Sequence, residues 1–256
     1  MLTIFSVPRS FDGDAAYRQV NALLSWSALI PRPNIILIGD EVGVDEVAQQ
    51  NQMVWVPDVA RNEFGTPLVN DVFEIANDVA HTDILAYVNS DIVLTSEFMG
   101  AAITLSATIR TPFLAVGQRY DVPIVPPLGS GVGQMVDMWE DTVRRTVLHQ
   151  GDLHQTAGID YFLFRPPVWP YIPPFALGRW RWDNWLIWSA LDQGVPVVDC
   201  TACVWAVHQN HDHNHVQGTV EKERNDELVR DNGGTLKRIH DATHRLNERF
   251  ILELTS

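Results

Sequence analysis

Short runs of apolar residues alternate along this chain with longer stretches in which apolar residues recur every three or four positions. The runs have the length and the β-branched or aromatic content of buried strands, whereas the wider spacing is typical of helices with one face turned to a core. Strands are predicted at residues 2–7, 34–38, 53–56, 84–88, 92–94, 112–120, 160–164 and 195–207. Helices are predicted at residues 15–29, 44–50, 67–80, 96–108, 132–148, 184–193, 221–230 and 235–254.

The regular alternation of strand and helix in the first 120 residues predicts an α/β fold, with a mostly parallel central sheet and helices on both faces. Polar loops follow several of the predicted strands, at residues 6–14, 39–40, 58–66 and 89–91. The carboxyl ends of parallel strands meet at one edge of the sheet, where open sheets of this kind bind their ligands. No GxGxxG or Walker motif follows any strand, which argues against a dinucleotide-binding enzyme or a P-loop NTPase.

The candidate site is centred on residues 84–94, ILAYVNSDIVL, where the triplet Asn89-Ser90-Asp91 interrupts two apolar runs. A carboxylate at the end of a buried strand can hold a divalent cation, and the cation can neutralise a diphosphate. A turn between two strands, with Asp91 in a local hydrogen bond, accounts for the triplet equally well. The triplet alone does not separate these two interpretations.

Length and charge limit the classes of function. A chain of 256 residues fits one large α/β domain or two small ones. Its net charge of −14 makes nucleic acid and anionic membrane surfaces poor partners, whereas a cation-bound phosphate substrate is compatible with it. No apolar run approaches membrane-spanning length, and the first residues lack the basic region of a signal peptide, so they are predicted to form a strand. We expect a soluble, cytoplasmic protein.

The two cysteines form a CxxC pair, Cys200 and Cys203, without the helix start or second pair that redox or zinc chemistry requires. We interpret both as buried thiols.

Asp183 lies among tryptophans at a predicted helix start. It suits an N-cap, and it also suits a general base that takes a proton from a sugar hydroxyl. The neighbouring tryptophans Trp180, Trp182, Trp185 and Trp188 suit a core or, where exposed, the face of a sugar ring.

Four histidines lie within residues 208–215, namely His208, His211, His213 and His215. They offer metal-capable imidazoles, although a solvated polar loop also explains the last three. His208 ends a predicted strand, so its backbone position should be fixed. An imidazole fixed beside a carboxylate-held cation is a candidate additional ligand.

The order and spacing of these segments resemble those of GT-A fold glycosyltransferases, from residue 2 to about residue 215. Asn89-Ser90-Asp91 resembles the DxD motif of that family, with Asn at the first position where the family often has Asp. The segment Gly158-Ile159-Asp160-Tyr161-Phe162 resembles the one that borders the acceptor site. Asp183 matches the acidic catalytic residue that opens a helix after the acceptor loop, and His208 matches the C-terminal histidine ligand.

The resemblance implies a single GT-A catalytic domain over residues 1–256, with a nucleotide-sugar half (1–120), an acceptor half (121–215) and a C-terminal helical segment (216–256). It implies metal-assisted, inverting transfer of a sugar from a nucleoside-diphosphate sugar to the hydroxyl of a glycan or other acceptor. Asp183 is the implied base, and Asp91 and His208 are the implied ligands of Mn²⁺ or Mg²⁺. The implied donor-binding residues are Ser6, Pro8, Arg9, Asp40, Arg61, Asn89, Ser90 and Asp91, and the acceptor-binding residues are Asp160, Tyr161, Trp180 and Trp182.

Two other functions fit parts of the sequence. A sugar-nucleotide pyrophosphorylase would share the alternating sheet, but its glycine-rich loop with a lysine is missing, because residues 7–14 hold one glycine and no lysine. A non-catalytic carbohydrate- or metal-binding protein would use the tryptophans and histidines without responding to a nucleoside diphosphate. The sequence does not indicate the base, the sugar, the acceptor or the oligomeric state.

Overall fold

The computed structural model describes residues 1–123, 125–130, 135–210 and 219–255, so the predictions for His211, His213 and His215 lie outside the described residues. The strands are β1 (Leu2–Ser6), β2 (Asn34–Ile38), β3 (Val54–Val56), β4 (Ile84–Val88), β5 (Ile92–Leu94), β6 (Phe113–Val116), β7 (Arg119–Val122), β8 (Asp152–Leu153), β9 (Tyr161–Arg165), β10 (Val197–Asp199), β11 (Ala206–Gln209), β12 (His244–Leu246) and β13 (Leu252–Leu254). The helices are α1 (Gly13–Ala28), α2 (Val44–Gln50), α3 (Val69–Val79), α4 (Ser96–Thr108), α5 (Trp139–Gln150), α6 (Trp182–Asp192) and α7 (Thr219–Asp231), with a 3₁₀ turn at Ile239–Asp241.

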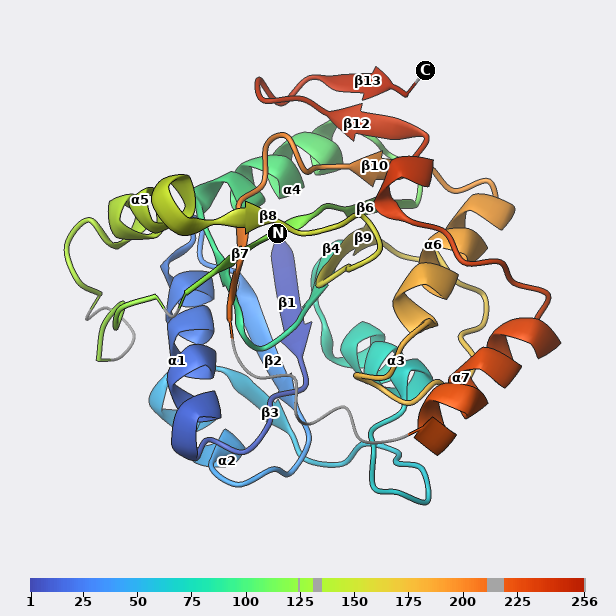
Figure 1. The fold of residues 1–256 in the computed structure, drawn as a ribbon, viewed down its shortest axis with the longest axis horizontal. Helices are drawn as coiled ribbons and strands as arrows, with labels where there is room; N and C mark the ends of the chain where they lie inside the picture. Colours follow the sequence, from blue (N-terminus) through green and yellow to red (C-terminus); the bar gives the residue numbers. More distant parts are fainter. Residues whose placement is uncertain (124, 131–134, 211–218, 256) are drawn as a thin grey trace.

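A large sheet runs through the molecule in the order β13-β12-β10-β6-β9-β4-β1-β2-β3 (Figure 1). Neighbouring strands are parallel from β4 through β1 and β2 to β3, whereas β9 runs antiparallel to both β4 and β6. The predicted α/β class with a mostly parallel central sheet is therefore confirmed. Because β9 is reversed, the residue that precedes it, Asp160, lies at the edge where β4 ends.

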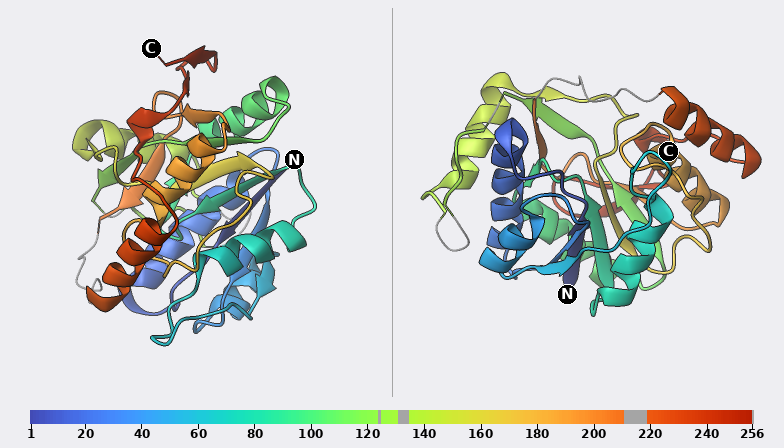
Figure 2. Two further views of the ribbon diagram at one scale, coloured as in Figure 1. Left: turned by 90° about the vertical axis from the view of Figure 1, so that its right-hand side faces the viewer. Right: turned by 90° about the horizontal axis from the view of Figure 1, so that it is seen from below.

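Helices cover both faces of this sheet because its strands are apolar on both sides (Figure 2). Successive strand residues point to opposite faces. Ile4 therefore packs with residues of α1, α2 and α4. Phe5 packs with residues of α3 and α6, and its ring lies edge-on to Phe73, with the centroids 5.2 Å apart. Both clusters contain strand residues from before and after residue 120, so the proposed halves share their cores.

A smaller sheet, in the order β5-β11-β7-β8, packs against α5 through a third apolar cluster that includes Val93, Val143 and Val207. Two predicted strands, at residues 112–120 and 195–207, each prove to be two strands that divide between the sheets. β6 and β10 belong to the large sheet, whereas β7 and β11 belong to the small one. The small sheet thereby carries Asp121 on β7 and His208 on β11 to the edge of the molecule where β4 ends.

The helix predicted for residues 235–254 is wrong, and among the described residues of the expected C-terminal helical segment α7 is the only α-helix. The chain forms a 3₁₀ turn and then the hairpin of β12 and β13, which pairs with β10. Ile239 is buried with the α3 and α6 cluster, whereas Leu246 is buried with the α1 and α4 cluster. A single straight helix cannot reach both faces of the sheet. The apolar residues of this segment are therefore buried one by one against different clusters, and they do not form one face of a helix.

Within the described part of the chain, no helix combines the length and the apolar character that crossing a membrane requires.

Candidate functional site

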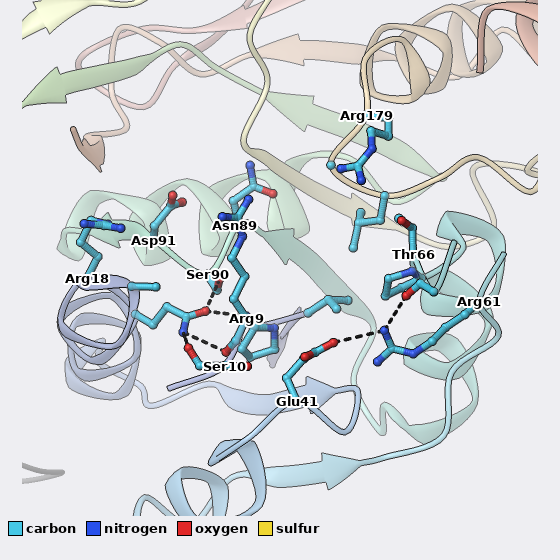
Figure 3. Close-up of a pocket in the computed structure, with 18 of the residues that line it drawn as sticks. Arg9, Ser10, Arg18, Glu41, Arg61, Thr66, Asn89, Ser90, Asp91 and Arg179 are labelled. Carbon is cyan, nitrogen blue, oxygen red and sulfur yellow. Dashed lines mark hydrogen bonds and ion pairs between the residues drawn. The ribbon is translucent and has the colours of Figure 1, made fainter. Parts of the chain in front are cut away.

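A cleft of about 570 Å³ opens where β1 and β4 end, at the edge of the sheet that the sequence predicts (Figure 3). It is lined by the loop after β1, the start of α1, the loops after β2 and β3, the triplet after β4, and the segment before α6. The lining residues are Val7, Pro8, Arg9, Ser10, Asp12, Ala15, Arg18, Gln19, Glu41, Arg61, Gly65, Thr66, Pro67, Tyr87, Asn89, Ser90, Asp91, Leu177, Gly178 and Arg179.

Asn89 is fixed between two neighbouring side chains. Its Nδ2 donates to Asp160 Oδ1 at 2.7 Å, and its Oδ1 accepts from the Tyr87 hydroxyl at 2.9 Å. The backbone N–H of Asn89 also donates to the carbonyl of Asp160, at 2.9 Å. An amide meets these demands because it donates and accepts at once, whereas a carboxylate would face Asp160 with a second negative charge.

An Asn89→Asp variant is therefore expected to be less stable than the wild type at pH 8, by about 1–3 kcal/mol, although it restores the common form of the motif. Two facing carboxylates share one proton, so the pKa of the pair rises and the destabilisation should shrink at pH 5. Urea denaturation at the two pH values measures the difference. Asn34→Asp, at the exposed start of β2, is the control, and equal stability of Asn89→Asp and wild type at pH 8 would contradict the expectation.

Gln19, on α1, joins the loop after β1 to the triplet. Its Oε1 accepts from the backbone N–H of Arg9 at 2.7 Å and from Ser90 Oγ at 2.9 Å, and its Nε2 donates to the carbonyl of Arg9 at 3.0 Å. The side chain is buried, so these bonds are shielded from water. Gln19 was not predicted, because its partners are distant in sequence and no local motif marks it.

Four arginines line the cleft, and two of them are neutralised by the protein. Arg61 pairs with Asp40 at 2.7 Å and with Glu41 at 3.2 Å, and Arg179 pairs with Glu221 at 2.7 Å. Arg9 and Arg18 form no ion pair with the residues that the structure describes. Their two positive charges are thus available to an anionic ligand, in a chain that is acidic as a whole.

Asp91 lines the cleft, and His208, which is buried and is not a lining residue, lies against it. His208 Nε2 is 3.5 Å from Asp91 Oδ2, and His208 Nδ1 is 3.1 Å from Asp121 Oδ1. Burial lowers the pKa of His208, but the Asp91 carboxylate outweighs burial and the pKa is raised above its ordinary value. With the Nδ1 proton donated to Asp121, it is Nε2 that faces Asp91, so a cation bound between Nε2 and the carboxylate would replace the proton on Nε2.

This pair fits a divalent cation by its chemistry. The described residues contain no group of three or more His, Cys, Asp or Glu side chains placed to hold a metal ion. A carboxylate and an imidazole are nevertheless a usual protein contribution where phosphate oxygens and waters complete the coordination. Asp121, which also accepts from Arg119 Nε at 2.8 Å and lies 2.5 Å from His154 Nδ1, holds His208 in place.

Asp183 lies in the first turn of α6, after Arg181 at the N-cap. The N–H of Asn184 donates to its Oδ1 at 2.9 Å. Burial, and secondly the neighbouring charge of Asp160, raise the pKa of Asp183 from 3.8 to about 7. A carboxylate with a pKa near neutrality is suited to accept a proton during a reaction. Asp183 does not itself line the cleft.

Only some of the predicted donor-binding residues line the cleft. Pro8, Arg9, Arg61, Asn89, Ser90 and Asp91 line the cleft. Ser6 does not, because it is buried and its Oγ donates to the carbonyl of Val88. Asp40 contacts the cleft only through Arg61.

The predicted acceptor-binding residues differ in their exposure to solvent. Tyr161 and Trp182 are buried in the core, and the Trp182 ring packs against Tyr87 and Phe162. We therefore correct their assignment, since neither side chain presents a surface to an acceptor. Trp180 is 62% exposed, with Lys222 Nζ 4.4 Å from its ring centre. Asp160 is buried and pairs with Arg119 at 2.6 Å.

No protein-family model matches the sequence, and no curated protein matches it in sequence either. Solved structures do match. GalNAc-T7, with UDP, GalNAc and Mn²⁺, has a TM-score of 0.56 over 90% of this chain, at 12% identity. Glucosyl-3-phosphoglycerate synthase from Mycobacterium tuberculosis, with Mn²⁺, uridine diphosphate and phosphoglyceric acid, has a TM-score of 0.54 over 92% of this chain, at 11% identity.

The chain has the GT-A fold. Both of these structures are nucleotide-diphospho-sugar transferases of that fold, so the predicted resemblance is confirmed at the level of structure. The matched region spans 48% of the GalNAc-T7 chain and 79% of the synthase chain. In this GT-A fold, the cleft, Asp91 and His208 lie at the edge of the sheet where parallel strands end.

Proposed function

We propose that this protein transfers a sugar from a nucleoside-diphosphate sugar to an acceptor hydroxyl. The observation that carries the proposal is the contact of His208 with Asp91, which lines a cleft that also presents Arg9 and Arg18. The two arginines can bind the negatively charged oxygens of a diphosphate, and Asp91 and His208 can hold a cation that binds the same group. The GT-A structures that the chain resembles contain UDP and Mn²⁺, which supports the same class of ligand.

In this proposal Asp91 and His208 hold the divalent cation, Mn²⁺ or Mg²⁺. The cation, when bound, would neutralise negative charge on the departing diphosphate. Asp121 keeps the His208 ring in the orientation that presents Nε2. Arg9 and Arg18 attract the donor and bind its phosphates, and Gln19 holds the Arg9 loop against Ser90.

Asp183 is the proposed general base. It takes the proton of the acceptor hydroxyl, whose oxygen then attacks the anomeric carbon opposite the diphosphate, so the product has inverted stereochemistry. The pKa of about 7 makes Asp183 a stronger proton acceptor than an ordinary aspartate while leaving it ionised in a large share of molecules at neutral pH. Exposed Trp180 is the proposed platform for the acceptor.

A thermal-shift panel is the first test: UDP, GDP, TDP, CDP and ADP, each with Mn²⁺ and with EDTA. A diphosphate at 100 times its Kd stabilises the native state by about 2.7 kcal/mol, which corresponds to a rise in Tm of roughly 5–10 °C. We expect one diphosphate to give this rise with Mn²⁺ and to lose it in EDTA.

The other outcomes are informative too. A rise that survives EDTA would keep the transferase but remove the metal role from Asp91 and His208. The absence of any response to a diphosphate would contradict the proposal and favour a non-catalytic carbohydrate- or metal-binding protein.

A further inference from the structure

Helix α7 holds together two loops that line the cleft, although α7 is not itself a lining element. The Glu221 side chain is 5% exposed, and its two oxygens serve different loops. Asn62 Nδ2 donates to Oε1 at 2.8 Å. Arg179 Nε donates to Oε2 at 2.8 Å. One buried carboxylate thus joins the 61–67 loop to the segment that precedes α6.

Arg179 uses one edge of its guanidinium for this pair. Nε and Nη2 both contact Glu221 Oε2, at 2.8 and 2.7 Å, and Nη1 takes no part in the pair. In the part of the chain that the structure describes, no second carboxylate pairs with Arg179. Figure 3 shows Arg179 and Thr66 on one wall of the cleft, with Asp91 and Arg18 toward the other.

The backbone on both sides of Arg179 is held separately. Buried Asn225 accepts from the N–H of Ala176 at 2.9 Å and donates to the carbonyl of Trp180 at 3.1 Å. These bonds already anchor the segment to α7. A buried carboxylate is costly unless it is paired, so the Glu221–Arg179 pair is an additional feature whose effect is to fix where the guanidinium lies.

We propose that Glu221 is a positioning residue for Arg179, and that Arg179 donates hydrogen bonds to the phosphates of a nucleoside diphosphate in the cleft. The inference rests on the proposed function, since it takes that ligand from it. The planar guanidinium fork suits phosphate oxygens, and a side chain fixed before the ligand arrives loses less conformational freedom on binding.

The test is calorimetric titration of wild type and variants with the five diphosphates of the thermal panel, each with Mn²⁺. Arg179→Gln and Glu221→Gln are each expected to raise the Kd of the bound diphosphate by about 10- to 100-fold, the range of a hydrogen bond to a charged group. The double variant should bind no more weakly than Arg179→Gln alone, because Glu221 acts through Arg179. If Glu221 merely held the loops together, Glu221→Gln would weaken binding further in the Arg179→Gln background.

Asp226→Asn is the matched control. It removes the Arg181–Asp226 ion pair, 2.6 Å long, which joins the same segment to the same helix on a side chain that does not line the cleft. Its Kd is expected to equal that of the wild type. Arg179→Lys keeps a cation beside Glu221, so the fold is retained. Lysine lacks the second N–H edge of the guanidinium, so this variant should also weaken diphosphate binding at least several-fold.

The inference is overturned if Glu221→Gln or Arg179→Lys binds the diphosphate like the wild type, or if the losses in the double variant multiply. In those cases a wild-type protein that still binds the diphosphate leaves the proposed function standing. A wild-type protein that binds none of the five diphosphates overturns both.

Discussion

An Asp183→Asn variant is expected to lose sugar transfer by about 10²- to 10⁴-fold, the usual contribution of a positioned general base. Asparagine keeps the shape of the side chain and can still accept from the N–H of Asn184, but it cannot take a proton. Binding of the nucleoside diphosphate should be unchanged, because Asp183 does not line the cleft. Initial rates and calorimetric titration with the diphosphate, on the same preparation, separate the two effects.

The pH dependence has a definite sign. Because the pKa of Asp183 is about 7, the wild-type rate should fall as the pH falls through 7, and this limb should vanish from any residual rate of Asp183→Asn. Stability should change in the opposite sense. The folded state keeps a proton between pH 4 and 7 that the unfolded chain releases, so the wild type loses stability as the pH rises through this window.

At about 1.4 kcal/mol per pKa unit, this loss amounts to at most about 4 kcal/mol, and Asp183→Asn should escape it. Denaturant unfolding at pH 5 and pH 8 measures it. Asp192→Asn, exposed at the other end of α6, serves as the control. A folded Asp183→Asn protein with full transfer activity would show that the base is elsewhere.

An Asp91→Ala variant is expected to lose the Mn²⁺-dependent thermal shift and about 10²- to 10³-fold of transfer activity, equivalent to several kcal/mol of charge stabilisation. Alanine leaves His208 as the only proposed protein ligand, since Asn89 is engaged by Tyr87 and Asp160. Thermal shift with the diphosphate, with and without Mn²⁺, is the measurement.

Removal of Asp91 also removes the charge that raises the pKa of His208, so the pKa of this histidine should fall in the variant. Asp58→Ala, exposed after β3 at the same edge of the sheet, is the control and should keep the shift. An Asp91→Ala protein that retains the full Mn²⁺-dependent shift would remove Asp91 from the metal site.

The central sheet could be predicted because each of its strands is marked by a short pattern of neighbouring residues. Apolar runs such as residues 84–88 specify a buried strand wherever they occur, and short polar segments mark where each strand ends. The edge that bears Asn89, Ser90 and Asp91 follows directly from that order. The resemblance in motif order added the GT-A fold, which the structure confirms.

The C-terminal region could not be predicted in the same way. Leu236, Ile239, Leu246 and Phe250 recur at helical spacing, but Leu236 is exposed and the other three pack against partners distant in sequence. Phe250, for example, lies over Gly100 of α4, where a Cβ would come within 3.1 Å of the ring. Tertiary packing on two faces of the sheet, together with pairing to β10, overrides the local pattern.

The residues that complete the candidate site were missed for a related reason. Each of them forms a hydrogen bond with a residue more than 40 positions away in the sequence. The pairs are Gln19 with Ser90, Asp121 with His208, and Glu221 with Arg179. None of these side chains belongs to a local motif. Trp182 illustrates the converse, since its neighbourhood suggested a sugar platform but its ring completes the core.

The position of β9 has a consequence for biosynthesis. The strand pairs with β4 on one side and β6 on the other, yet it is made after both. Until residue 165 has left the ribosome, the edges of β4 and β6 that β9 later covers are open, and open edges are sites of mispairing with other chains. A gene cut after residue 120 would leave those edges open permanently, so we expect residues 1–120 not to fold as an independent module.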